Sequence, residues 1–546
     1  MGVSVESEDR WALRRVPGEL ASRYISSGSW EDRTVGDLID SCLGSDPSRT
    51  IRIWSKTHPF NGTAGEVYEL ARKLAGALVS IGIGAGDVVA FQLPNWIEAA
   101  ATFYGCAILG AVLVPIVHFY GSKEVKFILS QSGAKALITA ERFGQHDYLS
   151  ELAEIRPKLP ELEQVVVVGR PPGGCHSFDG LVQEGNPLGE PAKVDPGAPA
   201  LVAYTSGTTS DPKGVVHTHR SLAFEVKQLS GLQSDRNRPS LTGAPVGHGI
   251  GMLSGLLVPL YRGFPLYLTD VWDPPAVLDA MVEASISSGS GSTYFLTSLL
   301  DSPGFGSKHS ALMGVIGLGG SPVPGAVADR AERLGISIVR SYGSTEHPST
   351  TGSRHTDDAF KRTHTDGRPL DQVELRIVDD AGKDLDAGEA GEILSRGPDL
   401  FMGYTDPALT AQAIDCEGWY RTGDIGYVDC DGFLTLTDRK KDIIIRGGEN
   451  VSAAEVEEAL ATMAGISEVA VVAAPDSRLG EHGCAFLRLS PGAKEPSLEQ
   501  VREHLAKAGL ARQKWPEELR VIEQMPRTPS GKIQKYVLRD RLRRGL

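Results

Sequence analysis

Helical and extended patterns alternate over residues 65–169, and no other feature of the sequence restricts the fold as strongly. Residues 65–83 place apolar side chains at helical spacing, and the apolar run DVVAFQL (87–93) follows. The order is repeated by a helical segment at 123–133 and by the strand-like runs KALITA and QVVVVG. Continuous apolar strands between helices are typical of buried sheets in α/β proteins. We therefore predict an α/β fold whose large N-terminal domain consists of layered sheets and helices.

The size and charge of the chain argue against several classes of protein. Its 546 residues suffice for roughly three or four units of ordinary domain size. Lysine and arginine number 55 against 69 acidic residues, so the net charge is −14. An acidic chain repels nucleic-acid backbones and anionic lipids, and we expect neither as the main partner. Six cysteines without a C-x-x-C pair indicate a reducing, cytoplasmic location. The N-terminus is acidic and lacks an apolar run, so we expect no signal peptide.

One uncharged segment has nearly the length of a membrane span. It covers residues 99–117, but Gly110 and Pro115 interrupt it. These residues favour a buried helix followed by a strand from about Val112, although periodicity alone does not exclude a span. We therefore expect no integral membrane segment.

Three further polar features are given structural interpretations. Residues 170–199 are rich in proline and glycine and are predicted to form a long surface connection. Residues 534–546 are locally basic and are interpreted as a solvated helix face. His217 and His219 alternate on a predicted strand and are not interpreted as metal ligands.

Beyond Asp424 the sequence changes character. A hairpin pattern, a charged joint and a strand are followed by a smaller α+β unit, which we predict to be mobile. Ser452-x-x-Glu455 and Ser497-x-x-Gln500 have the spacing of capping boxes that open two helices. We place the boundary in the charged joint, so that residues 1–440 form the large N-terminal domain and residues 441–546 the C-terminal domain.

The stretch YTSGTTSDPKG (204–214) has the composition of a phosphate-binding loop. Hydroxyl groups are dense in it, Gly207 allows close backbone approach, and Lys213 adds a positive charge. The apolar runs ALVAY and GVVHTH flank it, which predicts a turn between two strands. It is not a Walker loop, because glycine follows Lys213 where Ser or Thr is required. A Ser/Thr-rich turn without a ligand is the alternative.

Four more stretches complete a set that resembles one family. They are SYGSTE (341–346), YRTGD (420–424), DRKKDIIIRGGEN (438–450) and PRTPSGK (526–532). In this order the five stretches resemble the adenylate-forming superfamily of acyl-CoA synthetases, adenylation domains and luciferases. The resemblance implies that a carboxylate attacks the α-phosphate of ATP to give an acyl-adenylate and pyrophosphate. A thiol, usually coenzyme A, then displaces AMP. The implied cofactors are ATP, Mg²⁺ and coenzyme A.

The resemblance also implies roles for the nucleotide-binding residues. The first stretch would hold the β- and γ-phosphates through Thr205, Ser206, Gly207, Thr208, Thr209 and Lys213. Ser210 departs from the glycine of the common pattern. Gly319, Gly320, Ser321 and Tyr342 would form the adenine site, Thr345 would bind phosphate, and Ser341, Gly343 and Ser344 would complete the nucleotide-binding set. Tyr342 would stack on the base, Glu346 would bind Mg²⁺, and Asp424 with Arg439 would hold the ribose.

The catalytic step and the domain movement are implied for the C-terminal stretches. Lys532 resembles the lysine that bridges the carboxylate and the α-phosphate, where negative charge gathers. With Thr205, Glu346 and His248 it completes the predicted catalytic set. Lys441 takes the hinge position. Gly447 and Gly448 would let the pantetheine arm of coenzyme A pass close to the backbone, and Glu449 would belong to the same cofactor-binding segment. The sequence lacks the proline that commonly follows this last segment.

The acyl group is predicted from residues 242–260, a stretch without an acidic side chain. His248 either gates the acyl pocket or serves only the structure. Gly249, Gly251 and Gly255 are expected to leave room for an uncharged acyl body. These features predict a hydrophobic monocarboxylate, fatty, alicyclic or aromatic, and they disfavour amino acids.

Two other functions are kept as alternatives. In the first alternative, the chain transfers the acyl group to the phosphopantetheine of a carrier protein. In the second, it is a non-catalytic nucleotide-binding relative. A homodimer is also left open.

Overall fold

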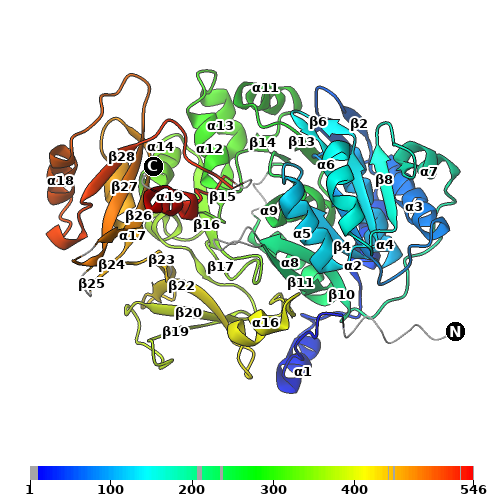
Figure 1. Ribbon diagram of the computed structural model, residues 1–546, viewed down its shortest axis with the longest axis horizontal. Helices are drawn as coiled ribbons and strands as arrows, with labels where there is room; N and C mark the ends of the chain where they lie inside the picture. The colour runs from blue at the N-terminus through cyan, green and yellow to red at the C-terminus, as the bar shows by residue number, and fades with distance from the viewer. Residues whose placement is uncertain are drawn as a thin grey trace.

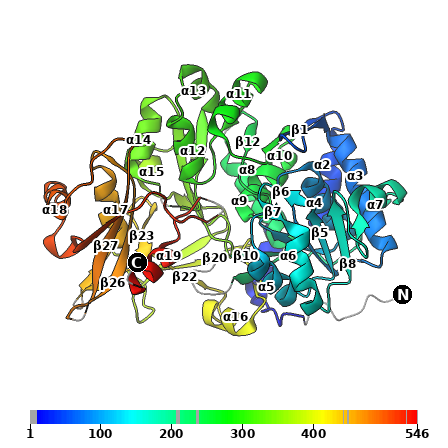
Figure 2. The same cartoon turned by 45° about the horizontal axis from the view of Figure 1, so that its top comes forward.

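The computed structural model describes residues 10–205, 212–233, 238–321, 323–440, 442–446, 449–476, 478–528 and 531–544. The N-terminal part is layered, and the C-terminal elements form a smaller unit beside it (Figure 1). Figure 2 shows the smaller unit next to α14 (Gly325–Arg333) and α15 (Ala359–His364) from a second direction.

The first large sheet contains the predicted alternating runs. Its strands are ordered β21-β11-β10-β4-β3-β5-β8-β9. Their bounds are Gly403–Tyr404, Lys213–Thr218, Pro199–Thr205, Val112–Ile116, Val88–Gln92, Ala136–Ala140, Gln164–Val168 and His176–Ser177. The central strands β4, β3, β5 and β8 pair in parallel. The α/β prediction is therefore confirmed.

Helices cover both faces of this sheet because its strands are apolar on both sides. Val89 and Phe91 pack into the cluster formed with α2 (Val35–Ser45), α3 (Ala64–Ser80) and α4 (Ile97–Leu109). Val88 and Ala90 point into the opposite cluster with α5 (Ser122–Ser132) and α6 (Tyr148–Ile155). Successive strand residues thus face opposite layers, as a pleated strand requires.

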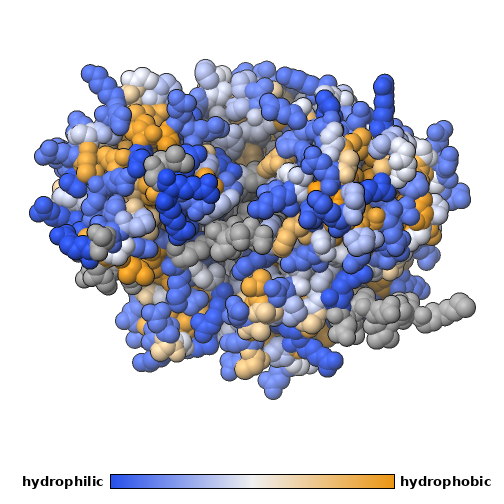
Figure 3. Space-filling model, viewed as in Figure 1, coloured by the Kyte–Doolittle hydropathy of each residue, from blue (hydrophilic) through white to orange (hydrophobic). Residues whose placement is uncertain are grey.

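The uncharged segment forms the predicted buried helix and strand. Helix α4 ends at Gly110, which has φ +72°, and β4 begins at Val112. A Cβ at Gly105 would lie 2.7 Å from the Ala71 carbonyl oxygen, so this glycine lets α3 and α4 approach closely. Among the described residues, no helix is both long enough and apolar enough to cross a bilayer. The surface in Figure 3 is mainly hydrophilic, with smaller apolar groups between the polar residues.

Three smaller sheets and the two-stranded hairpin of β6 (Arg142–Phe143) and β7 (His146–Asp147) complete the described N-terminal part. The second sheet has the order β14-β12-β13-β1-β2, with bounds Ser287–Ser288, Ser240–Thr242, Leu266–Thr269, Thr50–Trp54 and Phe60–Thr63. The third is β15-β16-β17-β18, over Val315–Leu318, Ser337–Tyr342, Thr351–Gly352 and Arg368–Pro369. The fourth is β19-β20-β22-β23, over Glu374–Val378, Gly391–Arg396, Tyr420–Val428 and Leu434–Arg439. The other helices of the N-terminal part include α1 (Gly18–Ser26), α8 (His219–Leu232), α9 (Gly249–Gly251), α10 (Val258–Tyr261), α11 (Pro274–Ala284), α12 (Thr293–Leu300), α13 (Ser307–Met313) and α16 (Pro407–Ala413).

The C-terminal unit is a twisted sheet between helices. Strands β24 (Ile444–Arg446), β25 (Glu449–Val451), β26 (Ile466–Asp476), β27 (Gly480–Leu489) and β28 (Glu518–Val521) form the sheet. Helices α17 (Ala453–Ala461) and α18 (Leu498–Lys507) cover one face, and α19 (Lys535–Arg543) covers the other through Leu538. A smaller α+β C-terminal unit is thus confirmed.

Only one of the two predicted capping boxes is complete. At Ser497 the side chain and Gln500 satisfy each other's backbone N–H groups. At Ser452 the hydroxyl accepts from the Glu455 N–H, but the Glu455 carboxylate binds the Lys514 ammonium at 2.6 Å instead of closing the box.

Three further expectations are corrected by the structure. Residues 170–199 are not one long connection, since they contain β9 and α7 (Phe178–Glu184), which buries Phe178. His219 does not lie on the strand: Thr218 caps a helix, and His219 is its first residue.

The basic helix α19 is solvated on one side only. Lys535 Nζ pairs with Glu457 Oε1 at 2.9 Å, and Arg539 Nη1 with Asp442 Oδ1 at 2.7 Å. Arg541 and Arg543 are exposed. Partly buried acidic partners therefore orient two of the five basic side chains of residues 534–546 inward.

Candidate active site

The phosphate-binding stretch lies between two antiparallel strands, as predicted. Thr205 ends β10 and stands opposite Lys213, which begins β11. Ser206, Gly207, Thr208 and Thr209 lie outside the described residues. Lys213 Nζ is 5.1 Å from the centroid of the Tyr404 ring, a cation–π distance. A Cβ at Gly214 would meet Thr405 Oγ1 at 2.7 Å, which explains why glycine follows the lysine.

The predicted adenine loops follow two adjacent parallel strands. Residues 319–321 come after β15 and residues 343–345 after β16, and these strands pair in parallel. The carboxyl ends of parallel strands are where α/β sheets bind ligands. Gly319 is confined, since its Cβ would lie 2.7 Å from Ser341 Oγ.

Asp424 connects the predicted base and ribose residues. It stands opposite Arg439 in the β22–β23 pair, and Arg439 Nε lies 3.0 Å from Asp424 Oδ1. The Tyr342 hydroxyl donates to Asp424 Oδ2 at 2.7 Å. Burial, aided by the Asp424 charge, raises the pKa of Tyr342 well above its usual range, so the phenol stays a neutral donor. The structure therefore brings together three residues that are far apart in the sequence.

Glu346 is a buried carboxylate held at one oxygen. The Tyr404 hydroxyl donates to Glu346 Oε1 at 2.8 Å, and the Phe401 N–H donates to the Glu346 carbonyl oxygen at 2.9 Å. Burial, aided by Glu346, raises the pKa of Tyr404, which keeps the phenol protonated. The described residues contain no group of three or more His, Cys, Asp or Glu side chains that could hold a metal ion. A lone carboxylate still fits Mg²⁺, because this ion is usually held by one or two carboxylates together with substrate phosphates.

The Lys532 turn of the C-terminal unit packs against the large N-terminal part. Lys532 N–H donates to Thr528 Oγ1 at 3.0 Å, and the Arg527 guanidinium binds the Gly531 carbonyl oxygen and Glu468. A Cβ at Gly531, which has φ +85°, would lie 2.9 Å from the Tyr294 Cβ atom. The lysine turn thus touches the beginning of α12.

The same helix start adjoins the predicted adenine loop. Ser321 Oγ accepts from the Thr293 N–H at 3.3 Å. The structure therefore brings the lysine turn and residues 319–321 to neighbouring positions on α12. The sequence could not predict this contact, because Thr293 and Tyr294 belong to no recognised motif.

His248 is built into the chain as a helix cap. Its Nδ1 accepts from the Ile250 N–H at 3.3 Å at the start of α9. Burial lowers its pKa to about 4, so the imidazole is neutral near pH 7. This position supports the structural interpretation of His248 without excluding contact with a substrate.

The three glycines after His248 do not all leave room. A Cβ at Gly251 would lie 2.1 Å from the Pro245 carbonyl oxygen, and one at Gly255 would lie 3.0 Å from Leu268. Only the Cβ direction of Gly249 is open, with nothing described within 4 Å. The expectation is therefore wrong for Gly251 and Gly255, which permit close packing.

The apolar residues of this segment were expected to favour an uncharged acyl body, but Trp272 and Phe295 were missed. A Cβ at Gly320 would lie 2.7 Å from the Ile250 Cδ1 atom, so Ile250 reaches the predicted adenine loop. Trp272 and Phe295 pack edge to face with ring centroids 4.7 Å apart. Residues 252–257 wind as a π-helix, a form often found at functional sites. Their apolar spacing gave no signal that distinguishes them from ordinary core.

The residues on either side of the predicted hinge are bound to different parts of the molecule. Lys441 itself, Gly447 and Gly448 lie outside the described residues, as does the side chain of Glu449. Lys440 Nζ pairs with Asp380 at 3.2 Å, and the Lys440 N–H donates to the Gly423 carbonyl oxygen. Asp442 pairs with Arg539 of α19. The chain thus leaves the fourth sheet at Lys440 and joins the C-terminal unit at Asp442.

This two-part α/β fold is that of acid–CoA ligases. The chain belongs to the AMP-binding enzyme family: the family model matches residues 45–405, and that of the AMP-binding enzyme C-terminal domain matches residues 455–532.

Curated relatives and solved structures agree with this assignment. The medium-chain fatty-acid–CoA ligase of Escherichia coli K12 is 35% identical over 528 residues, covering 96% of this chain and 93% of that protein. The 3-[(3aS,4S,7aS)-7a-methyl-1,5-dioxo-octahydro-1H-inden-4-yl]propanoyl:CoA ligase of Rhodococcus jostii RHA1 is 34% identical, covering 88% and 93%. The crystal structure of the anthranilate CoA ligase AuaEII in complex with anthranoyl-AMP superposes with a TM-score of 0.85 at 25% identity, covering 94% and 98%.

Proposed function

We propose that this chain activates a hydrophobic monocarboxylate with ATP and transfers the acyl group to coenzyme A. The observation that carries the proposal is the packing of the Lys532 turn on the start of α12, which also contacts Ser321 of the predicted adenine loop. This arrangement suits adenylation, because it gathers cationic and polar groups from both parts of the molecule where phosphate charge would develop.

In the first step, adenylation, the site residues have separate roles. Lys213 and Thr205 hold the pyrophosphate leaving group, and Asp424 with Arg439 orients the ribose. Lys532 stabilises the charge that develops as the carboxylate oxygen meets the α-phosphate. Mg²⁺, when bound through Glu346 and the phosphates, supplies additional neutralisation of charge.

The second step requires a different arrangement. We assign residues 1–440 to one body and 441–546 to the other, with the pivot at Lys441. Rotation about this position would replace the Lys532 turn with residues 447–449, so that the thiol reaches the acyl-adenylate. The separate anchoring of Lys440 and Asp442 supports this division.

The substrate class is inferred from the surroundings of Gly249. His248 is neutral, no acidic side chain occurs in residues 242–260, and Ile250, Trp272 and Phe295 supply apolar surface. A free amino acid would lack a partner for its ammonium group in this stretch. Fatty, alicyclic and aromatic acids remain as candidates, in line with the acids named for the three proteins compared above.

A panel of carboxylic acids with ATP, Mg²⁺ and coenzyme A tests the proposal. We expect AMP and pyrophosphate in equal amounts and a thioester mass for hydrophobic acids. A preference for free amino acids would contradict the substrate class, and absence of an acyl-adenylate for every acid would contradict the reaction. Replacing coenzyme A with a phosphopantetheinylated carrier protein tests the alternative acceptor.

The role of Lys532 is tested by separating the two half-reactions. We expect Lys532→Ala to lower the adenylation rate by about two to three orders of magnitude, the usual cost of losing a group that stabilises transition-state charge. Thioester formation from supplied acyl-adenylate should be retained. Lys514→Ala, a nearby C-terminal lysine paired with Glu455, is the control. Equal loss of both half-reactions would show that Lys532 serves the structure.

A further inference from the structure

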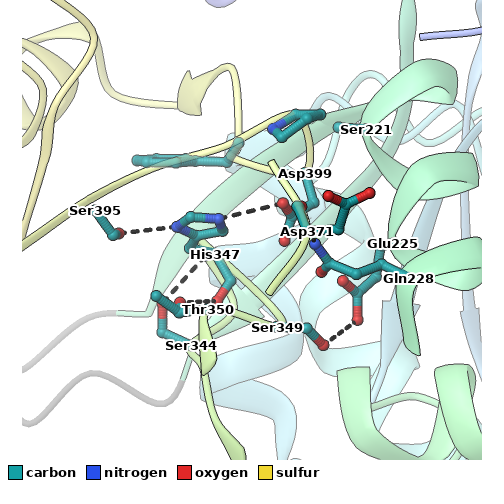
Figure 4. Close-up of polar contacts among 12 residues, drawn as sticks. Ser221, Glu225, Gln228, Ser344, His347, Ser349, Thr350, Asp371, Ser395 and Asp399 are labelled. Atoms are coloured by element: carbon teal, nitrogen blue, oxygen red, sulfur yellow. Dashed lines mark hydrogen bonds and ion pairs between the residues drawn. The ribbon is translucent and has the colours of Figure 1, made fainter. Parts of the chain in front are cut away.

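Behind the turn that carries Thr345 and Glu346 lies a buried group of polar side chains (Figure 4). We call it the His347 network: Glu225 from α8, His347 and Ser349 from the turn, Ser395 from β20, and Asp399 from the loop that follows. Asp399 and Ser395 are 0% exposed, and Glu225 and His347 are 1% exposed. Such burial excludes contact with a substrate, so these residues act through others.

His347 is held at both ring nitrogens. Its Nδ1 lies 2.8 Å from Ser395 Oγ, and its Nε2 lies 3.2 Å from Asp399 Oδ1. Serine, histidine and aspartate in this order resemble a nucleophilic triad. Here the serine hydroxyl is fully buried and no carbonyl substrate reaches it, so the arrangement serves to orient the imidazole.

The network contains two carboxyl groups that require a shared proton. The Ser349 hydroxyl donates to Glu225 Oε1 at 2.6 Å, while Glu225 Oε2 and Asp399 Oδ2 are buried without a partner among the described residues. Two ionised carboxylates offer each other no donor. Burial, together with the Asp399 charge, raises the pKa of Glu225 well above its usual range. Glu225 is therefore the carboxyl group that holds the proton, which makes it able to donate to Asp399.

The main chain of His347 closes the turn. Its carbonyl oxygen accepts from the Ser344 N–H at 2.9 Å and from the Thr350 hydroxyl at 3.3 Å. Its N–H donates to the Ser344 hydroxyl at 3.2 Å. A Cβ at Gly343 would lie 1.8 Å from the Pro348 carbonyl oxygen, so the turn is compact. Fixing the imidazole thus fixes the backbone that carries Thr345 and Glu346.

The turn is also supported from the side of β11. His217 Nε2 lies 2.7 Å from the Thr345 carbonyl oxygen, and burial lowers the pKa of His217, which leaves it a neutral donor. Tyr404 holds the Glu346 side chain. The turn is therefore held by described neighbours on α8, β11, β20, β21 and the 397–401 loop.

We propose that Asp399 and His347, with Glu225 as the hydrogen-bond donor to Asp399, are positioning residues that preorganise Thr345 and Glu346 for Mg·ATP. The inference rests on the proposed function, because it assigns these two residues to the nucleotide. Preorganised groups cost no rearrangement when the ligand arrives. Loss of the network should therefore weaken Mg·ATP binding more than it slows a step that does not use the phosphates.

The test compares two isosteric substitutions. Asp399→Asn removes the charge opposite His347, and we expect the KM for Mg·ATP in pyrophosphate exchange to rise by about tenfold, equivalent to ~1.4 kcal/mol. Glu225→Gln keeps a donor for Asp399 and an acceptor for Ser349, and we expect the KM to stay within about twofold of the wild-type value. Thioester formation from supplied acyl-adenylate should be retained in both variants.

Each outcome decides for or against the proposal. An unchanged KM in a folded Asp399→Asn variant would overturn it, as would equal damage from Glu225→Gln. If Asp399→Asn does not fold, Ser349→Ala removes the bond to Glu225 and should also raise the KM. Calorimetry on the same variants measures the affinity for Mg·ATP without any catalytic step. A wild-type protein that does not perform the proposed reaction can therefore be distinguished from a network that does not affect nucleotide binding.

Discussion

At the scale of single residues, the site depends on groups whose charge is fixed by their neighbours. Asp424 is nearly buried at 5% exposure, yet it faces a cation, Arg439, and a phenol that burial keeps neutral. Arg439 and the Tyr342 hydroxyl each lie within bonding distance of a different oxygen of this carboxylate. The carboxylate can then accept hydrogen bonds from ribose hydroxyls through the remaining lone pairs of its oxygens.

This arrangement predicts the effect of removing only the charge. Asp424→Asn keeps the size of the side chain but loses the charge-assisted bond to Arg439, a bond of about 1.5–3 kcal/mol. We expect the KM for ATP to rise by roughly tenfold or more, measured by pyrophosphate exchange. Asp429→Asn is the control, because Asp429 lies in the same hairpin and pairs with Lys361. A similar change in both variants would indicate a general loss of stability.

The proton on Glu225 predicts a pH dependence of stability. Its folded pKa lies above the unfolded value of 4.5, so the folded state holds the proton over a pH range where the unfolded state has lost it. The free energy of unfolding therefore falls as pH rises from 4.5 toward the folded pKa, with a slope of at most about 1.4 kcal/mol per pH unit.

Denaturant unfolding of the wild-type protein and Glu225→Gln from pH 5 to 8 measures this slope. The glutamine variant should lack the contribution of Glu225, while those of His217 and His248 cancel in the comparison. Identical slopes in the two proteins would show that Glu225 is ionised in the folded state.

The motif residues of the site could be predicted from the sequence, but their supports could not. Tyr342, Asp424, Arg439 and Lys532 were found because the family pattern preserves both the residue types and their order. Glu225 and Asp399 lie in stretches without a pattern, and only the folded chain brings them to His347. Tertiary contacts of this kind leave no local signal in one sequence.

At the scale of elements, the segment after β12 combines close packing with open space. The sequence predicted room at three glycines, but periodicity cannot tell which side of a helix meets backbone. The structure separates them: Gly251 abuts carbonyl oxygens, and Gly249 faces open space next to His248. The same limitation applied to His219, since strand alternation and the first turn of a helix look alike over three residues.

One added methyl group is expected to affect stability differently at Gly251 and at Gly249. Gly251→Ala should lower the free energy of unfolding by about 1–3 kcal/mol, because the Pro245 carbonyl oxygen must move. Gly249→Ala should leave stability within about 0.5 kcal/mol. If the open space belongs to the acyl site, Gly249→Ala should also shift the acid preference toward shorter or narrower acids. Thermal unfolding and the acid panel measure both effects, and equal destabilisation by the two substitutions would contradict the assignment.

At the scale of the whole molecule, several of the described contacts between the two parts are polar. Ser452 Oγ donates to the Thr437 carbonyl oxygen at 3.2 Å, and the Ala454 N–H donates to Asp438 at 3.4 Å. Gly325 of α14 lies near Glu458 of α17, where a Cβ would be 3.6 Å from the carboxylate. Interfaces of this type separate at low cost, since few apolar side chains need to become exposed. The alternation of patterns predicted the layers of each part, but the contacts between the parts depend on side chains with no common motif.

The pivot at Lys441 gives the most direct test of domain movement. Lys441→Pro fixes the φ angle there, and we expect thioester formation to slow by at least about tenfold while adenylation changes little, because only the second step needs the rotation. Lys441→Ala removes the side chain but keeps the backbone free, so it should retain both rates. Single-turnover measurements of acyl-adenylate formation and of its consumption by coenzyme A separate the steps. The side chains of Lys440 and Asp442 pair with different parts of the molecule, so a rigid pivot between them should affect only the step that follows rotation. If proline slows both steps equally, the hinge is placed at the wrong residue.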